Sequence, residues 1–376
     1  MKKKIDISIV VVTRNDNHGL NLNERTNRFI NSCCYMSKKH KVQTELIIVE
    51  WNPPKNSPSI IELVSPMIAK HDFIDIRIIT VPRSLHKSLD NSKNLQLFQM
   101  IGKNVGIRRA NGEFILATNI DIIFSDQIFR VFKKGLKQNI LYRCYRLDVP
   151  QNFAFEKSPI KLLKKCKKSF HTINTRFGTF VIRSNILRRT LSIIPFNLRF
   201  RVYVLFFTLF RFFGDFNKAL PLISYFSTKK NKSTLHNKFK IFKENLKIHF
   251  FNSLFFTNAC GDFTLMDKKS WEKTRGYIEW PIYSLHIDSF ILYQSFYKKI
   301  KINILSSSHI FHIDHSIGSG FSVDGEKILF SNLRKKSIPY IDYDEYKQIV
   351  TKIKEDKITL NKKWGFKDFN FKESNI

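Results

Sequence analysis

The chain has few cysteines and no long apolar run. Five of its 376 residues are cysteine, and no two of them form a C-x-x-C pair. An odd number without such a pair argues against a disulfide framework and a zinc site, and it favours a reducing compartment. The apolar runs that end at Val12 and Phe210 are far shorter than the ~20 residues of a membrane-spanning helix. Because Asp6 interrupts the first run and no small-residue cleavage site follows it, we interpret it as a buried strand rather than a signal peptide.

Acidic residues are also scarce. The chain has 31 Asp and Glu against 64 Lys and Arg, which gives a net charge of +33. Residues 157–250 alone contain 21 basic and 2 acidic residues. Such a charge favours an anionic partner, although abundant Lys, Asn, Ile and Phe could also reflect base composition. No helix-turn-helix, zinc or RNA-binding signature occurs, so a nucleic-acid-binding protein is the alternative and not the leading hypothesis.

Two further absences narrow the class of protein. No internal repeat is visible, which argues against a repeat architecture. No Gly-rich, basic phosphate loop occurs near the N-terminus, and a nucleotidyltransferase would need one. Hydrophobic residues make up 43% of the chain, which is ample for a packed core.

The hydrophobic pattern predicts an α/β fold. Apolar strand-like runs at residues 5–13, 45–51, 74–81 and 113–118 alternate with helical segments at 20–37, 60–70 and 95–110. This alternation favours a mainly parallel sheet with helices on both faces. Ligands of such sheets bind beyond the carboxyl ends of the strands, so the polar residues there are the candidates for ligand binding. They lie at residues 13–16, 50–52 and 119–121, and the candidates among them include Thr13, Arg14, Asn15, Glu50, Asn119 and Asp121.

The second half of the chain is less regular. Residues 195–226 contain nine phenylalanines with interleaved Arg and Lys, typical of an amphipathic helix at a membrane interface. An insertion helix packed on the core is the alternative. Strands are expected at 263–266 and 300–305, and helices at 268–274, 287–299 and 343–354. We divide the chain into the first half of the main domain (1–150), a basic, Phe-rich insertion (151–254), the second half of the main domain (255–326) and a helical C-terminal tail (327–376).

Residues 103–121, KNVGIRRANGEFILATNID, resemble the Asn-x-Gly-Ile/Leu-x-x-Ala-x-Gly-Glu segment, apolar strand and Asp-x-Asp motif of glycosyltransferase family 2. Residues 10–15 and 46–52 resemble the first two strands of that family. The resemblance implies a GT-A fold, a Rossmann-like mostly parallel sheet flanked by helices, with Asn104 and the strand-end residues near the donor. Asp121 matches the last Asp of the motif, the usual ligand of Mg²⁺ or Mn²⁺. Asn119 departs from the first Asp, and Glu50 stands where the family commonly has Asp.

Residues 258–263, 271–279 and 286–288 resemble later family segments. Asp288 matches the carboxylate that serves as catalytic base, which the reaction needs to deprotonate the acceptor hydroxyl. Ile287 replaces the acidic residue that usually precedes it, so Glu279 competes for the same role. GT-A enzymes often add a late His as a metal ligand, and His312 suits that position. His309 and His315 lie close in sequence and stay open as alternatives.

The resemblance implies an inverting, metal-assisted glycosyltransferase, with residues 1–150 as its nucleotide-sugar-binding half and residues 255–326 as its acceptor and catalytic half. The expected donor is a nucleotide sugar, preferably a UDP-sugar, and the expected acceptor is a glycan or a lipid-linked sugar of the cell surface. We expect a cytoplasmic protein attached peripherally to the anionic inner face of the plasma membrane. A non-catalytic relative that binds sugar nucleotides is a further alternative, motivated by Asn119 and Ile287.

Overall fold

The computed structural model describes residues 4–17, 19–64, 72–182, 195–206, 255–315 and 323–376. Most of the Phe-rich segment and the basic stretch after it, residues 207–254, lie outside the described residues. Within the described residues, no helix is both long enough and apolar enough to cross a membrane.

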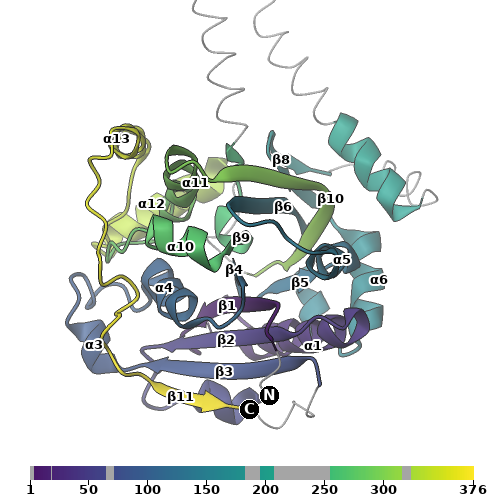
Figure 1. Cartoon of the computed structure of the whole chain (residues 1–376), viewed down its shortest axis with the longest axis horizontal. Helices are drawn as coiled ribbons and strands as arrows, with labels where there is room; N and C mark the ends of the chain where they lie inside the picture. Colours follow the sequence, from purple (N-terminus) through teal and green to yellow (C-terminus); the bar gives the residue numbers. More distant parts are fainter. Residues whose placement is uncertain (1–3, 18, 65–71, 183–194, 207–254, 316–322) are drawn as a thin grey trace, which may run out of the picture.

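Within these ranges, eleven strands form one sheet in the order β11-β3-β2-β1-β4-β9-β6-β10-β5, and β7 and β8 extend it from β6 (Figure 1). The strands are β1 (Ile7–Thr13), β2 (Thr44–Trp51), β3 (Ile74–Val81), β4 (Phe114–Ala117), β5 (Ile122–Phe124), β6 (Ile140–Val149), β7 (Thr172–Thr175), β8 (Gly178–Val181), β9 (Thr264–Asp267), β10 (Lys301–Ile313) and β11 (Lys372–Asn375).

The expected α/β fold is confirmed, and its parallel part is the N-terminal half. Strands β3, β2, β1 and β4 pair in parallel, and every residue of β1 and β2 is buried. Continuous β-branched runs are stable there because helices cover both faces. The rest of the sheet is mixed, since β9 pairs antiparallel with β4 and β6, and β10 pairs parallel with β6 but antiparallel with β5. The mostly parallel expectation thus fails where the strand–helix alternation ends, after β4.

Helices cover both faces of the sheet, and two hydrophobic clusters result. Residues of α1 and α5 join the cluster on one face, and residues of α4, α10 and α11 join the cluster on the other. The helices are α1 (Leu22–His40), α2 (Ile60–Val64), α3 (Arg83–Lys87), α4 (Gln99–Arg109), α5 (Asp126–Lys134), α6 (Pro159–Ser169), α10 (Lys268–Thr274), α11 (Ile287–Tyr297), α12 (Val323–Lys335) and α13 (Tyr343–Lys354), with 3₁₀ turns η2 (Gln151–Phe155) and η3 (Cys260–Asp262).

Two regions differ from the expected division of the chain. Strand β7, within the expected insertion, pairs with β6 and so belongs to the main sheet. The C-terminal tail contains the expected helix α13, but it ends in β11, which pairs antiparallel with the edge strand β3. Between them, Arg109 donates hydrogen bonds to the backbone oxygens of Gly365, Phe366 and Phe369. The tail therefore runs along one side of the sheet to its edge (Figure 1).

Candidate functional site

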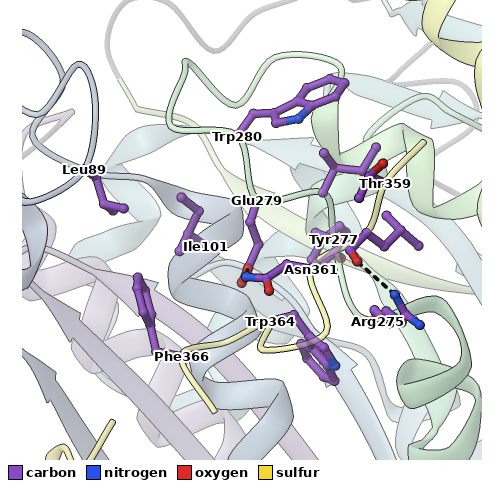
Figure 2. A pocket seen from close by; sticks show the side chains of 12 residues that line it. Leu89, Ile101, Arg275, Tyr277, Glu279, Trp280, Thr359, Asn361, Trp364 and Phe366 are labelled. Atoms are coloured by element: carbon purple, nitrogen blue, oxygen red, sulfur yellow. Dashed lines mark hydrogen bonds between the residues drawn. The ribbon is translucent and has the colours of Figure 1, made fainter. Parts of the chain in front are cut away.

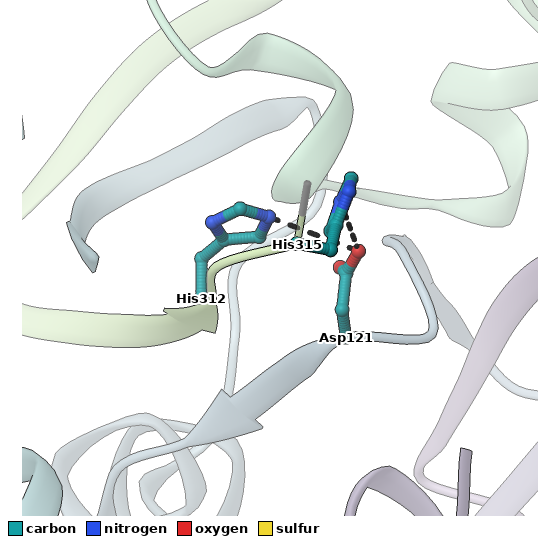
Figure 3. A group of neighbouring side chains, drawn as sticks. All are labelled: Asp121, His312 and His315. Carbon is teal, nitrogen blue, oxygen red and sulfur yellow. Dashed lines mark ion pairs between the residues drawn. The ribbon is translucent and has the colours of Figure 1, made fainter. Parts of the chain in front are cut away.

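Asp121 lies in the short turn between β4 and β5, where two histidines and an arginine approach its carboxylate. Its Oδ2 lies 3.0 Å from Nε2 of His315, 3.7 Å from Nε2 of His312 and 3.4 Å from a guanidinium nitrogen of Arg25. Figure 3 shows the two imidazoles turned toward the Asp121 carboxylate. All of these side chains are buried or nearly so, and the cluster forms a compact group beyond the end of β4.

Strand pairing brings these residues together although they are almost 200 positions apart in the sequence. Strand β10 pairs antiparallel with β5, which places His312 opposite Ile122. The backbone N–H of Ile313 also donates to the carbonyl oxygen of Asp121. His315 follows directly after the end of β10. Asp121 and His312, both predicted as metal ligands, thus lie close together, and His315 lies beside them.

The donor atoms fit a divalent cation. The carboxylate and the two imidazole nitrogens lie within 4.8 Å of one another. Oδ1 of Asp121 is buried and has no hydrogen-bond partner among the described residues. Burial acts to raise the pKa of Asp121, but His312, His315 and Arg25 outweigh it and hold the pKa well below its usual value. An ionised carboxylate with two imidazoles is a ligand set that suits Mn²⁺ and other first-row metals.

Asn119 is joined to a carboxylate from another part of the chain. Its Nδ2 donates to Oδ1 of Asp262 at 2.6 Å, and its Oδ1 accepts from Nε2 of Gln99 at 2.9 Å. Thr118 donates to the backbone oxygen of Asp262 at 2.6 Å. Asp262 thus places a carboxylate beside the position where the family motif has its first Asp. A second carboxylate at residue 119 would repel it, which gives a physical reason for the asparagine.

Asp288 lies in the first turn of α11 and faces the turn η3. Its Oδ2 accepts a hydrogen bond from the backbone N–H of Gly261 at 2.6 Å, and Lys103 donates to the backbone oxygen of Gly261 at 2.7 Å. Burial raises the pKa of Asp288, and the nearby Lys103 opposes that rise. His286, not Asp288, occupies the N-cap position of α11. Asp288 is therefore not the N-cap of this helix, and its carboxylate is held by the N–H of Gly261.

The fully buried ammonium group of Lys103 was missed by the sequence analysis. Burial lowers the pKa of Lys103 to about 8, although Asp262 and Asp288 act to raise it. The signal in the sequence was a single charged residue within an otherwise uncharged stretch of the helix at residues 99–107. The Lys103 ammonium group thus lies near the carboxylates of Asp262 and Asp288.

Comparisons with known proteins add little to this geometry. No protein-family model matches the chain, and no curated protein matches it. Among solved structures, a crystal structure of GalNAc-T7 with UDP, GalNAc and Mn²⁺ aligns over 98% of this chain at 9% identity, with a TM-score of 0.39. The chain spans 57% of the length of that protein. A likeness at this level carries no argument about function, so the account depends on the residues themselves.

The strand-end residues expected near the donor gather at one edge of the sheet. Thr13 and Glu50 are register neighbours at the ends of β1 and β2. Asn15 has a left-handed backbone (φ 58°) and donates through Nδ2 to the backbone oxygen of Pro58. Arg14 donates to the backbone oxygen of Asn52 at 3.2 Å. Glu50 is buried and accepts from the backbone N–H at residue 60, and burial raises its pKa. These contacts fix the loops that border the edge.

The hydrogen bonds of Asn104 and Glu279 hold the 277–279 loop and the C-terminal tail. Asn104 is fully buried; its Nδ2 donates to the backbone oxygen of Tyr277, and its Oδ1 accepts from the Tyr277 N–H. Glu279 accepts from Asn104 and from the backbone N–H of Gly365 at 2.7 Å, and also from Asn361 at 3.2 Å. We therefore correct the expected donor contact of Asn104, because its amide is consumed in holding the 277–279 loop.

Glu279 instead lines a pocket of about 180 Å³ between that loop and the C-terminal tail. Figure 2 shows its carboxylate beside Asn361, with Trp280 and Trp364 also lining the pocket. Neither Asp121 nor Asp288 lines this pocket. Since the Glu279 carboxylate connects the loop to the tail, the geometry favours Asp288 over Glu279 as the proposed base.

His309 does not join the cluster. Its ring is fully buried and lies 4.9 Å, 5.3 Å and 5.0 Å from the rings of Phe196, Phe200 and Phe311. Burial among these rings lowers the pKa of His309 to about 3, with Lys167 adding to the effect. His309 thus packs against the helix at residues 196–206 as a neutral aromatic side chain.

Proposed function

We propose that the chain is a glycosyltransferase of the GT-A type that transfers a sugar from a nucleotide-diphosphate sugar, preferably a UDP-sugar, to a hydroxyl group of a glycan or lipid-linked acceptor. The observation that carries the proposal is the convergence of Asp121, His312 and His315. Asp121 ends a motif that resembles family 2, and it lies beside two histidines, with which it could hold a metal ion, at the edge of the sheet where ligands of such folds bind.

In this proposal Asp121, His312 and His315 hold Mg²⁺ or Mn²⁺, which when bound would offset the negative charge that develops on the departing nucleoside diphosphate. The loops after β1 and β2, with Thr13, Arg14, Asn15 and Glu50, border the nucleotide. These loops are tied to each other by hydrogen bonds, so the edge is ordered before a donor arrives.

Asp288 is the proposed general base. It takes the proton from the acceptor hydroxyl as the oxygen attacks the anomeric carbon and the bond to the diphosphate breaks. The N–H of Gly261 fixes the orientation of the carboxylate, and burial raises its pKa toward the range useful for a base. A single displacement of this kind inverts the anomeric centre, as the family resemblance implies.

A second function is favoured by Arg25. Its guanidinium lies 3.4 Å from Oδ2 of Asp121 and supplies a positive charge where a metal ion would otherwise bind. A chain that keeps this ion pair would bind a sugar nucleotide without metal and without turnover. The two functions differ in a single observable, whether nucleotide is released from a bound sugar nucleotide.

The test is a screen of UDP-, GDP- and dTDP-sugars for nucleotide release with Mn²⁺, Mg²⁺ or a chelator. Metal-dependent release that falls at least 100-fold in both Asp121→Asn and Asp288→Asn supports the transferase. Asp344→Asn is the control, because Asp344 is 85% exposed on α13 and pairs with Lys347, away from the residues proposed for the site. Binding without release by the wild-type chain, with or without metal, favours the non-catalytic function. Tight salt-sensitive binding of nucleic acid with no binding of any sugar nucleotide contradicts both.

We also propose that the protein attaches to the anionic cytoplasmic face of a membrane. The helix at residues 196–206 exposes Leu198, Val202, Leu205 and Phe206, which share one face at helical spacing. It contacts α6, where Arg199 donates to the backbone oxygen of Lys167. Five of the eleven residues of α6 are lysine. Exposed apolar side chains beside clustered positive charge are the features of an interfacial helix.

A further inference from the structure

Asp148 is a buried carboxylate of β6 that contacts the far side of the His312 ring. Strands β6 and β10 pair in parallel with Asp148 and His312 in register. Nδ1 of His312 lies 3.3 Å from Oδ1 of Asp148, while Nε2 of the same ring lies 3.7 Å from Oδ2 of Asp121. The imidazole is therefore placed between two carboxylates, one on each nitrogen.

Asp148 is itself firmly held. Nε of Arg146 lies 2.8 Å from its Oδ1, and Nδ2 of Asn174 donates to its Oδ2 at 3.0 Å. Because Arg146 and Asp148 are two apart on one strand, their side chains lie on the same face of the sheet. Arg146 also pairs with the carboxylate of Asp262, which in turn accepts the hydrogen bond of Asn119. One continuous buried chain of polar contacts thus runs from His312 to Asn119.

Burying these charged side chains is not an efficient way to stabilise the fold. Removing ionised groups from water is unfavourable, and a buried ion pair seldom stabilises a fold more than apolar residues of the same size. A histidine that binds a metal commonly donates its other ring N–H to a carboxylate, which fixes the ring orientation and tautomer. Asp148 stands where such a partner of His312 would stand.

We propose that Asp148 is a positioning residue that holds His312 with Nε2 directed toward the Asp121 site, and that Arg146 and Asp262 extend the same support to Asn119. The inference rests on the proposed metal-assisted function. It goes beyond that function because it assigns a task to Asp148, Arg146 and Asp262, three charged residues to which the proposed function gives no role.

A neighbouring carboxylate provides a matched control. Oδ1 of Asp314 lies 3.8 Å from the same Nδ1, but its side chain is 42% exposed and pairs with His171 at 2.9 Å. If Asp148 orients the ring, Asp148→Asn must weaken metal binding and Asp314→Asn must not. If nearby negative charge alone matters, the two variants must behave alike.

The experiment measures Mn²⁺ affinity of the full chain, without donor, by electron paramagnetic resonance of free and bound ion. We expect Asp148→Asn to weaken binding 10- to 100-fold, the range typical of lost outer partners of metal-binding histidines. We expect less than threefold for Asp314→Asn. Spin-echo measurements on ¹⁵N-histidine protein should show coupling from two imidazoles in the wild type, and from one in Asp148→Asn at saturating Mn²⁺.

Equal Mn²⁺ affinity of Asp148→Asn and the wild type, or an unchanged two-imidazole signal, would overturn the inference and leave the proposed function intact. Absence of Mn²⁺ binding by the wild-type chain would overturn the metal site and the inference together. Circular dichroism and thermal unfolding verify that each variant folds. If Asp148→Asn does not fold, Asn174→Ala removes one hydrogen bond to Asp148, and a several-fold weaker Mn²⁺ affinity is then expected; an unchanged affinity counts against the inference.

Discussion

Asn119 and Asp262 share a single negative charge beside the proposed metal site. Their side chains are 2.6 Å apart, and Arg146 pairs with the carboxylate from the other side. The Asn119 amide therefore matches the Asp262 carboxylate to which it donates, and its presence in place of Asp does not by itself indicate the loss of a ligand. The sequence alone identified Asn119 as a departure from the family motif. It could not reveal Asp262, because the contact joins positions 143 residues apart.

Restoring the family residue at this position should harm the fold. In Asn119→Asp the new carboxyl group at residue 119 would face the carboxylate of Asp262, and this repulsion raises the pKa of the new group in the folded state above its value in the unfolded chain. The folded state then binds more protons, so its stability falls as pH rises through the raised pKa. We expect a loss of about 1–3 kcal/mol at pH 7 in urea unfolding, with partial recovery toward pH 4.

The exchanged pair is the control for that experiment. Asn119→Asp combined with Asp262→Asn keeps one carboxylate and one amide, so most of the lost stability should return at pH 7. If the single and double variants are equally unstable, the repulsion between residues 119 and 262 is not the cause.

Lys103 should give the protein a measurable alkaline signature. Its pKa is lowered to about 8 in the folded state, by burial against the opposing attraction of Asp262 and Asp288, while an unfolded lysine titrates near about 10.4. Between these values the unfolded state binds a proton that the folded state has released, so this group makes stability rise with pH. The wild type should gain about 3 kcal/mol relative to Lys103→Met between pH 8 and 10.5. Parallel stability–pH curves for the two proteins would contradict the lowered pKa.

At the scale of elements, helix α4 lies unusually close to the sheet. A Cβ atom at Gly106 would come within 2.5 Å of Cγ1 of Val10 and 3.1 Å of Cγ2 of Val49. The glycine that the sequence shares with family 2 is thus explained by packing, because it lets the helix rest on β1 and β2. A larger residue must move the helix that carries Lys103 and Asn104.

Gly106→Ala should destabilise this protein, although the same change in an exposed helix would stabilise it. In an exposed helix the change would stabilise by about 1 kcal/mol. Here overpacking should instead destabilise the protein by about 1–3 kcal/mol, measured by urea unfolding. Val10→Ala in the same chain removes the contacted methyl groups, so Gly106→Ala should cost clearly less in that background. A stabilising effect in the wild-type background would show that α4 is less closely packed.

Elements with strong local patterns were predictable from the sequence, and elements made by distant pairing were not. The apolar runs of β1 and β2, the alternating pattern of β3 and the amphipathic period of α13 specify their own structure. Strand β10 extends to Ile313, well beyond the expected residue 305, through a serine-rich stretch. It is extended there because it pairs with β6, and β11 forms from the polar residues KESN because β3 offers a free edge. The local sequence of a segment does not reveal which distant strand it pairs with.

At the scale of the whole molecule, the charge of +33 and the exposed helix at residues 196–206 lead to one prediction. The full chain should float with vesicles that contain about 30% anionic lipid at 50 mM salt, and release at about 500 mM salt as the charges are screened. Leu205→Glu should reduce flotation several-fold, since Leu205 is 61% exposed. Tyr343→Glu, at a 66% exposed position on α13 at the other end of the molecule (Figure 1), is the control. Equal flotation of all three proteins would contradict the membrane proposal.

The central claim is that Asp121, His312 and His315 form the metal centre of a sugar-nucleotide site. The most direct measurement is calorimetric titration of UDP into the full chain with and without Mn²⁺, for the wild type, His315→Ala and the control His171→Ala, whose imidazole pairs with Asp314 instead. The account predicts that Mn²⁺ tightens UDP binding at least tenfold in the wild type and in His171→Ala, and that His315→Ala loses most of this gain. UDP binding that is indifferent to Mn²⁺ in the wild type, or unchanged by His315→Ala, would contradict it.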